Sequence, residues 1–560
     1  MTAWIHNPAL ILIGAGLVLP LLPRAVRAVL LIGAPLAAAA WLWSMPDSLT
    51  LSATLFGYEL TPFRLDALSF VFALLFLLAM GLIGVFMMRT ASRTESAASL
   101  IYSGSAVGAV LAGDLATLFI YWEITAIASA LVIFANGPDS YRAGFRYLMI
   151  QITSGLMLFV GALIHFRETG SLGFELFGLD AAGGWWLFLG FGIKAAFPIG
   201  HIWVKDAYPS ASASGTVVLS AFGTKMAIYA LARGFAGTDL MIPIGTVMAA
   251  FPVFFAVIEN DLRRVLAYST INQLGFMVVG IGVGTELALN GAVAHAFVHV
   301  FFKGLLFMTM GAVLLRAGTC KGSELGGLYK SMPWTTALCI IGAASISAFP
   351  LFSGFVSKSL IMSDVAYQGH VFIWLVLLFA AAGVFHHSGI KIPYFAFFAH
   401  DAGIRCKEAP AEMMTAMVIA AVVCVGVGIF PQPLYSILPY PVDYVPYTAS
   451  HVLSQTQLLI FSALAFTVLM RTGIYPPELR STNLDVDWFF RRAIPDLAAA
   501  SERVLVTLRG HLDRAFGVCA RMLASRALRE RMIHSRPTGA MAWWMGLLFA
   551  ILLIFGIRQG

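Results

Sequence analysis

The chain alternates between apolar runs of helical length and short breaks that are polar or rich in glycine and proline. A helix needs about 20 mostly apolar residues to cross a bilayer. No lysine or arginine precedes the first run, so we expect a retained span rather than a cleaved signal peptide. The pattern therefore predicts an all-α, polytopic membrane protein with about 14–16 transmembrane helices. The runs fall at 8–23, 26–45, 66–88, 96–113, 115–135, 145–166, 185–205, 212–234, 240–258, 264–284, 287–315, 333–361, 371–399, 412–431, 452–471 and 541–558.

Composition excludes a soluble protein. Of 560 residues, 59% are hydrophobic and 11% are charged, whereas soluble domains carry about 45–50% apolar and about 25% charged residues. The cysteines are scattered without a CxxC pair, so we expect neither a cysteine-ligated cluster nor a disulfide framework. They are Cys320, Cys339, Cys406, Cys424 and Cys519.

Lysine and arginine are concentrated in every second break between the apolar runs. Acidic residues predominate in the breaks between those. Cytoplasmic loops of membrane proteins carry the excess of lysine and arginine. The charge pattern predicts an N-terminus outside and a multi-pass protein of the cell inner membrane. The basic breaks hold Arg24, Arg27, Arg89, Arg93, Arg142, Arg146, Lys205, Arg263, Arg264, Arg316, Lys321, Lys330, Arg405 and Lys407.

The stretch 473–540 departs from this composition, because arginines there are interleaved with apolar residues three or four apart. That spacing predicts an amphipathic helix at the cytoplasmic interface, followed by a last span over 541–560. The net charge of +7 suggests nucleic-acid binding as an alternative function. A basic segment tethered between two spans favours the membrane surface instead, so we expect no nucleic-acid partner.

Several ionisable residues lie inside apolar runs. Inserting a charge at the centre of a membrane helix costs about 2.5–3.5 kcal/mol, so a charge kept there usually serves a function. Glu123 lies near the middle of its run and is the only carboxylate that we expect deep within the core spans; the alternative is a carboxylate that reaches outward from a helix end. Lys194 and Lys358 lie in runs interrupted by proline and glycine, a pattern typical of transporters built from inverted repeats. The predicted helix breaks are at Pro198, Gly200, Pro350 and Gly354.

Lys225 is a third lysine in an apolar run, and one later run places His295, His299 and Lys303 at i, i+4 and i+8. This spacing aligns the three side chains along one stripe of a helix. A single buried histidine is more often a hydrogen-bonded core residue, but two histidines and a lysine on one stripe favour a proton relay. The nearby group His386, His387 and Lys391 lies toward the end of a run, where we expect solvent.

These residues suggest a proton switch. Burial disfavours an ammonium, and a nearby carboxylate restores its proton affinity. We therefore expect Lys194 to hold its proton while Glu123 is close and to release it toward Lys225 when the two separate. Lys358 would exchange protons with the far side. No GxxxxGK[ST] loop and no HExxH are present, so we expect no cofactor and no metal.

Six segments carry a resemblance to a known family: WEITAIAS, GFGIKAAFPIGHIWVKDAYP, SAFGTKMAIYAL, IENDLRRVLAYSTINQLGFM, HAFVHVFFKGLLFM and FPLFSGFVSK. They resemble the antiporter-like subunits of Mrp-type cation/proton antiporters and of respiratory complex I. The likeness covers roughly residues 60–400 and is strongest to the D-type Mrp subunit and the M-type subunit of complex I. It implies a core of two inverted five-helix repeats and assigns the essential glutamate, broken-helix lysine, bridging lysine and terminal lysine to Glu123, Lys194, Lys225 and Lys358.

The resemblance and the runs together predict the organisation of the chain. We expect N-terminal transmembrane helices, a first and a second five-helix repeat, C-terminal transmembrane helices, the amphipathic segment and a final helix. Their ranges are 1–95, 96–235, 236–400, 401–472, 473–540 and 541–560.

Three functions remain open at this point. The first is the proton-translocating subunit of a multisubunit Mrp-type Na+/H+ antiporter. The second is a membrane subunit of a complex I-like NADH:quinone oxidoreductase or membrane hydrogenase, with the redox chemistry in other chains. The third is the membrane partner of an inorganic-carbon uptake system. The first two predict other membrane subunits as partners, and the third predicts a soluble carbonic-anhydrase-like protein. All three involve the lipid bilayer and protons, and the first also involves Na+.

Overall fold

The computed structural model describes residues 5–55, 57–475, 478–479 and 483–523. The chain divides into two units, residues 1–483 and 484–560, and each is described by itself. The final span expected at 541–558 lies outside the described residues.

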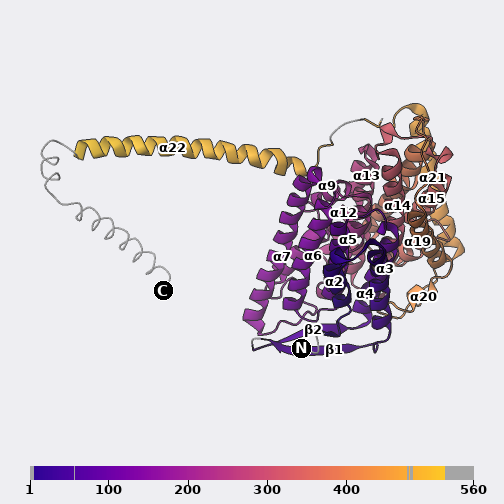
Figure 1. The fold of residues 1–560 in the computed structure, drawn as a ribbon, viewed down its shortest axis with the longest axis horizontal. Helices are drawn as coiled ribbons and strands as arrows, with labels where there is room; N and C mark the ends of the chain where they lie inside the picture. The colour runs from indigo at the N-terminus through magenta and orange to yellow at the C-terminus, as the bar shows by residue number, and fades with distance from the viewer. Residues whose placement is uncertain (1–4, 56, 476–477, 480–482, 524–560) are drawn as a thin grey trace. The chain divides into compact units, whose positions relative to one another are not determined.

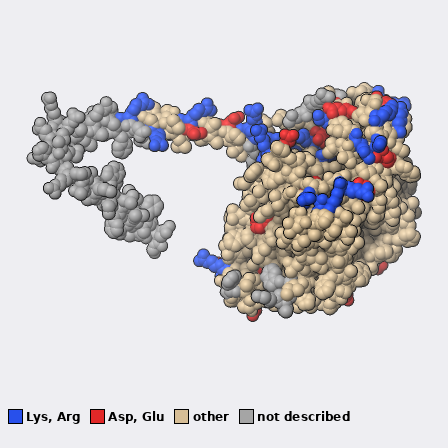
Figure 2. All heavy atoms as spheres, viewed as in Figure 1, with Lys and Arg blue, Asp and Glu red and all other residues tan. Residues whose placement is uncertain are grey.

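The first unit is a bundle of helices with a short β hairpin at one end (Figure 1). Every apolar run expected before residue 472 coincides with a helix or with a pair of half-helices. Among the described residues, 11 helices are long and apolar enough to cross a membrane. Uncharged residues cover most of the visible face of this unit (Figure 2).

The elements of the first unit, in chain order, are α2 (Ala9–Val18), η1 (Leu19–Leu21), α3 (Arg24–Trp43), β1 (Leu49–Leu55), β2 (Tyr58–Leu65), α4 (Ala67–Met87), α5 (Arg93–Val110), α6 (Leu115–Phe134), η2 (Pro138–Ser140), α7 (Tyr141–Thr169), α8 (Gly184–Lys194), α9 (Ile202–Ser210), α10 (Ala213–Ala221), α11 (Gly223–Gly234), α12 (Met241–Ile258), α13 (Leu262–Val283), α14 (Glu286–Ala317), η3 (Gly322–Glu324), η4 (Leu328–Lys330), α15 (Pro333–Ile346), α16 (Ser353–Tyr367), α17 (Val371–Val384), η5 (Phe385–Ile390), α18 (Lys391–Pro393), η6 (Tyr394–Phe398), α19 (Ala411–Ile429), α20 (Gln432–Tyr435) and α21 (Ala449–Thr472).

Polar side chains at the helix starts satisfy backbone groups that lipid cannot. The side chain of Asp66 accepts a bond from the Ser69 amide at the start of α4, and Ser69 accepts one from the Asp66 amide. Asp114 and Asp261 likewise accept backbone amides at the starts of α6 and α13. These aspartates therefore fix where three spans begin.

Helices α10, α11, α13 and α14 form the centre of the bundle, because other helices enclose them on nearly all sides. Helix α13 is buried almost throughout even though it carries Ser269, Thr270, Asn272 and Gln273. Polar residues inside a membrane helix face neighbouring helices rather than lipid. The interior between α13 and α14 is therefore rich in polar groups.

Two spans are broken, and Pro198, Gly200 and Pro350 of the predicted break residues lie between the half-helices, whereas Gly354 lies in the first turn of α16. Between α8 and α9, Ala196 and Ile199 have φ of 64° and 72°; between α15 and α16, Ala348 and Leu351 have φ of 58° and 72°. Both pairs occur in the same Ala-Phe-Pro-Ile/Leu segment. The two breaks thus have closely similar φ angles at corresponding positions.

The β hairpin at residues 49–65 was not foreseen among the helices. Strands β1 and β2 are antiparallel and turn at Gly57, whose φ is 85°. The alternation of leucine with threonine and serine in β1 was the available signal. The Thr61 carbonyl accepts a bond from the Gly113 amide, so the hairpin holds the start of α6.

An ion pair at the end of the hairpin joins the start of α4 to α11. Arg233 donates to both carboxylate oxygens of Asp66, at 2.7 and 2.8 Å. Burial disfavours the charged form of Asp66, but the bonds from Arg233 lower its pKa below the usual value. The pair therefore stays ionised and fixes one end of α11, which carries Lys225 near its other end.

The second unit contains η7 (Phe489–Ala493) and α22 (Ile494–Leu523). Leu497, Val504 and Leu508 are exposed and lie on one face of α22, while Arg503 and Arg514 lie on another. The predicted amphipathic helix is present over this range.

The break after α8 generates a stability prediction. A β-branched residue with positive φ costs about 1–3 kcal/mol, which glycine relieves. We expect Ile199→Gly to raise the free energy of unfolding by about 1 kcal/mol. The measurement is thermal unfolding in detergent with a dye that labels the buried Cys339 and Cys424 as they become accessible. Ile127→Gly, at another exposed position inside α6, is the control and should lower stability.

Candidate functional site

The six basic residues predicted for the membrane core are all buried. The exposed fraction is 0% for four of them, 2% for Lys194 and 4% for Lys358. They come from four helices, α8, α11, α14 and α16. Since burying a charge is costly, their concentration in one region indicates function. The four fully buried residues are Lys225, His295, His299 and Lys303.

Lys194, at the last turn of α8, binds α6 through oxygens that carry no charge. Its Nζ donates to the Thr125 hydroxyl at 2.9 Å and to the Trp122 carbonyl at 3.2 Å. The same Nζ lies 4.3 Å from the centre of the Trp122 ring, within cation–π range. Two oxygens and an aromatic face thus replace part of the water lost on burial.

Glu123 is half-buried on α6, and a glycine leaves room for it. A Cβ placed on Gly155 of α7 would lie 1.5 Å from Oε1 of Glu123. That oxygen is buried and has no hydrogen-bond partner among the described residues. The structure therefore holds the predicted Glu123–Lys194 pair in a separated arrangement, with Lys194 bonded to Thr125 and Trp122 instead.

Lys225 and Lys358 each bind a backbone carbonyl beside a helix break. Lys225 Nζ donates to the Ser220 carbonyl at 2.5 Å, in the last turn of α10. Lys358 Nζ donates to the Ile346 carbonyl at 2.8 Å, at the end of α15. Pro350, four residues after Ile346, has no N–H to compete for that oxygen. Each break thus supplies an acceptor for a lysine.

The stripe on α14 is continuous in space but not in hydrogen bonds. His295 bonds Ser357 of α16 at 2.9 Å and Gln273 of α13 at 3.1 Å. The His295 and His299 rings are 6.2 Å apart, and neither nitrogen of His299 has a hydrogen-bond partner among the described residues. Lys303 donates to the Leu266 carbonyl at 3.2 Å.

Hydroxyl groups lie beside Lys194 on the side of α7, and no motif in the sequence had indicated them. Thr125, which binds Lys194, accepts through its backbone carbonyl a bond from Ser129 at 2.5 Å. The Tyr147 hydroxyl donates to Ser129 at 2.8 Å. The Tyr102 hydroxyl accepts the amide of Gly223, two residues before Lys225, at 2.8 Å. These groups lie in the interior near both lysines.

A cavity of about 810 Å³ reaches Lys358 between α16, α17 and α21. Polar residues line it beyond the lysine, including Ser359, Asp443 and Gln455. Ser363 and Tyr444 share a hydrogen bond of 2.8 Å on its wall. Lys358 is thus a buried basic residue with a polar cavity beside it.

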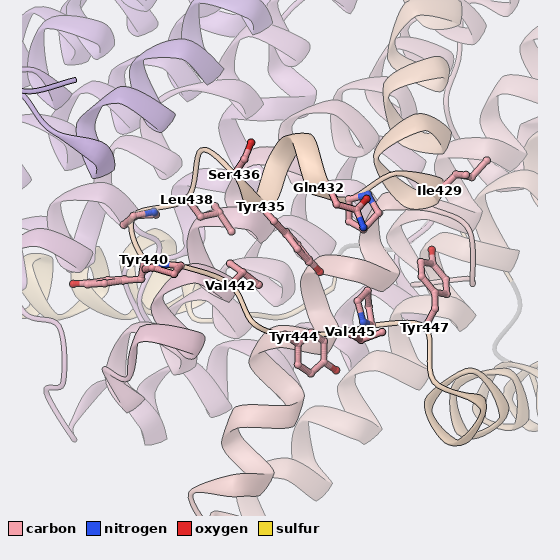
Figure 3. Close-up of a pocket in the computed structure, with 14 residues that line it drawn as sticks. Ile429, Gln432, Tyr435, Ser436, Leu438, Tyr440, Val442, Tyr444, Val445 and Tyr447 are labelled. Atoms are coloured by element: carbon pink, nitrogen blue, oxygen red, sulfur yellow. The ribbon is translucent and has the colours of Figure 1, made fainter. Parts of the chain in front are cut away.

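A second cavity, of about 670 Å³, lies in the loop 429–447 (Figure 3). Figure 3 shows Tyr435, Tyr444 and Tyr447 among its lining residues. The Tyr435 hydroxyl donates to the Val356 carbonyl at 2.8 Å, and Tyr447 donates to the Gly428 carbonyl. This loop therefore supports α16 two residues before Lys358.

Two features differ from the sequence expectations. Glu123 was expected to be the only deep carboxylate, but Glu95 in α5 is 3% exposed and accepts bonds from Ser212 and Ser214 at 2.6 and 2.5 Å. Its place in the first turn of a helix concealed this burial. The group expected to be solvated is also inside: His387 and Lys391 are fully buried, and Glu478 from the segment after α21 covers Lys391.

Comparisons with known proteins match most of the membrane-spanning part of the chain to one family. Residues 112–425 match the family described as NADH:quinone oxidoreductase/Mrp antiporter, transmembrane. The chain is 30% identical over 438 residues to the A-type subunit of the Na(+)/H(+) antiporter of Alkalihalophilus pseudofirmus, covering 68% of this chain and 54% of that one. It is 29% identical over 373 residues to Hydrogenase-4 component B of Escherichia coli, covering 59% and 55%. The chain therefore spans about half the length of these curated relatives.

Two solved structures have the same fold. In the Mrp complex from Dietzia sp. DQ12-45-1b the match has a TM-score of 0.78 at 25% identity and covers 100% of this chain and 63% of that one. In the archaeal membrane-bound sulfane sulfur reductase the TM-score is 0.73 at 22% identity, covering 98% and 99%. The second of these is a respiratory membrane complex, and the likeness shows that this chain has the same fold as one of its chains.

Lys303 offers a test of whether the buried bases stabilise the fold. Its Nζ bonds the Leu266 carbonyl, which also accepts the Thr270 hydroxyl. Burying an ammonium that has no carboxylate partner costs free energy, and an apolar side chain of similar length avoids that cost. We expect Lys303→Met to raise the melting temperature and the exposed control Lys321→Met to leave it unchanged. A lower melting temperature for Lys303→Met would mean that the lysine is structural.

Proposed function

The chain belongs to the NADH:quinone oxidoreductase/Mrp antiporter transmembrane family, and we propose that it is the proton-translocating subunit of a multisubunit antiporter that exchanges Na+ or a similar cation for protons. The observation that carries the proposal is the series of buried titratable groups on α6, α8, α11, α14 and α16. A membrane helix tolerates such groups where ions or protons pass.

The groups follow one another across the bundle from Glu123 to the cavity at Lys358. Lys194 takes a proton when Glu123 approaches and passes it, through water and the hydroxyls near Tyr147, toward Lys225. The histidines of α14 carry it on to Lys358. Ser357 lies one residue before Lys358 and bonds His295 directly, which supports transfer between α14 and α16.

The broken helices supply the mobile parts of this scheme. We infer that they are corresponding elements of two repeats, 96–235 and 236–400, because their φ angles match. Lys194 leaves Trp122 and Thr125 when α8 shifts at its break, and it then meets Glu123. Positive φ at Ala196 and Ile199 stores backbone strain beside the moving residue, as is common at functional sites.

The chemistry of the site favours protons over Na+ as the species carried. Sodium requires several oxygen ligands, whereas amines and imidazoles exchange protons and repel cations. No group of three or more His, Cys, Asp or Glu that could hold a metal ion occurs among the described residues. We therefore assign the cation pathway to another subunit or to an interface. We assign the basic loops to the cytoplasmic side, because cytoplasmic loops carry the excess of lysine and arginine.

A membrane subunit of a redox complex is the second candidate. The match to the sulfane sulfur reductase chain covers nearly the whole length of both chains, and Hydrogenase-4 component B is as similar as the antiporter subunits. In that case the same proton line would be driven by electron transfer in other chains. Purifying the complex through a tag on this chain and identifying its other subunits separates the two candidates.

Glu123 and Gly155 give a direct test of proton translocation. In inverted vesicles with an imposed pH gradient, added Na+ or K+ should release protons, which a pH-sensitive dye reports. We expect Glu123→Gln to abolish the exchange. Gly155→Ala should slow it by at least about tenfold, because the methyl group displaces the carboxylate.

Gly33→Ala is the matched control, since a Cβ there meets nothing within 4 Å. It should leave exchange at the wild-type rate. Wild-type exchange in Glu123→Gln vesicles would refute the proposed function.

A further inference from the structure

A second buried group of titratable residues lies away from the series just described. It is centred on η5, a π-helical turn that interrupts the span between α17 and α18. Such turns are rare and are frequently found at functional sites. The turn packs against α12, α13, α15 and α21. Its titratable residues, and the carboxylate that meets them, are His386, His387, Lys391 and Glu478.

Lys391 occupies the outer end of this group. Its side chain is fully buried and forms an ion pair of 2.9 Å with Glu478, which is 6% exposed. Its Nζ also donates to the carbonyls of Val257 at 2.6 Å and Glu259 at 2.7 Å, at the end of α12. The loop that follows leads directly to Arg263 and Arg264. Lys391 therefore lies at the arginine-rich end of the bundle.

His387 occupies the inner end. Its ring is fully buried, and its Nδ1 bonds Ser388 at 2.9 Å, which in turn donates to Ser269 of α13 at 2.9 Å. Its Nε2 has no hydrogen-bond partner among the described residues. Ser269 lies about one turn of α13 from Leu266, whose carbonyl accepts the bond from Lys303, so the hydrogen bonds of His387 and of Lys303 reach neighbouring turns of the same helix. His387 thus lies between the ion pair and the stripe on α14.

Glu478 faces the loops at the arginine-rich end. An ideal Cβ on Gly322 would lie 3.4 Å from Oε2 of Glu478. Burial raises the pKa of Glu478, while the neighbouring Lys391 opposes that rise. His386 lies nearby and stacks on Tyr475, with ring centres 5.5 Å apart. Glu478 is therefore the first of these titratable groups that a proton would reach from the arginine-rich end of the bundle.

We propose that Glu478, Lys391 and His387 form a second proton branch, which connects the arginine-rich end of the bundle with the central series at Lys303. This inference rests on the proposed proton translocation. The branch joins the series beyond Glu123, Lys194 and Lys225, and the exchange cycle draws protons through both, so that blocking either one slows exchange.

One proton is conserved at each step of the branch. Glu478 takes up a proton from water while Lys391 remains an ammonium. Lys391 gives its proton to Nε2 of His387 and recovers one from the Glu478 carboxyl group, so the ion pair returns to its starting state. The imidazolium then transfers its proton to the neutral amine of Lys303. Lys391 must lose its proton for this transfer, and that requirement distinguishes a relay from a structural cap on α12.

Lys391→Arg separates the two roles. Arginine keeps the positive charge and can bond the α12 carbonyls and Glu478, but it does not release its proton in proteins. In the vesicle assay of the intact complex we expect Lys391→Arg to reduce proton exchange by at least about tenfold. Lys330→Arg is the control, because Lys330 forms an exposed ion pair of 2.7 Å with Asp401. The Lys330→Arg variant should exchange protons at the wild-type rate.

His387→Gln serves as the second variant, in case Lys391→Arg does not accumulate in the membrane. It removes the titratable ring and keeps a hydrogen-bonding side chain, and it should also slow exchange. Wild-type exchange in either variant, at normal protein levels, would overturn the branch. If Glu123→Gln abolishes exchange while Lys391→Arg and His387→Gln do not slow it, the branch fails and the proposed function stands. If Glu123→Gln has no effect, the proposed function fails.

Discussion

The binding of lysine ammonium groups by backbone carbonyls is the interaction on which the interior of this protein depends. An ammonium in an apolar medium needs acceptors to replace its water, and an intact helix has few carbonyls to offer because its own amides use them. The breaks in α10–α11 and α15–α16 release carbonyls where Lys225 and Lys358 need them. Elsewhere α6 and α13 share carbonyls that also accept threonine hydroxyls.

This arrangement gives the lysines acceptors without giving them fixed counter-ions. A carboxylate at salt-bridge distance would hold each proton firmly, whereas a carbonyl dipole stabilises the ammonium less. In the central series the lysines bind carbonyls and hydroxyls, and Glu123 stands apart from Lys194. At Lys391 the protein combines both kinds of partner. The difference fits a central series that transfers protons readily and an outer pair that stays ionised between transfers.

Much of this could be predicted from the sequence, because the cost of burying charge is visible there. The order of spans, the two proline breaks and the six buried bases followed from apolar runs and from ionisable residues within them. Partners that depend on tertiary structure could not be predicted: nothing near Gly155 in the sequence points to Glu123, and the Ile346 carbonyl is twelve residues from the lysine it binds. Lys391 was misjudged because a position near a helix end suggests solvent until another segment covers it.

The separation between His295 and His299 has a consequence for the membrane as an insulator. No described protein group bonds either nitrogen of His299. The hydrogen bonds of the proposed proton series are therefore interrupted at this residue. A cell that stores energy as an ion gradient loses that energy through any path that conducts protons continuously. Under the proposed function, two rings whose centres lie 6.2 Å apart exchange a proton only when the side chains move or another group joins them, which would limit the leak of protons between working cycles.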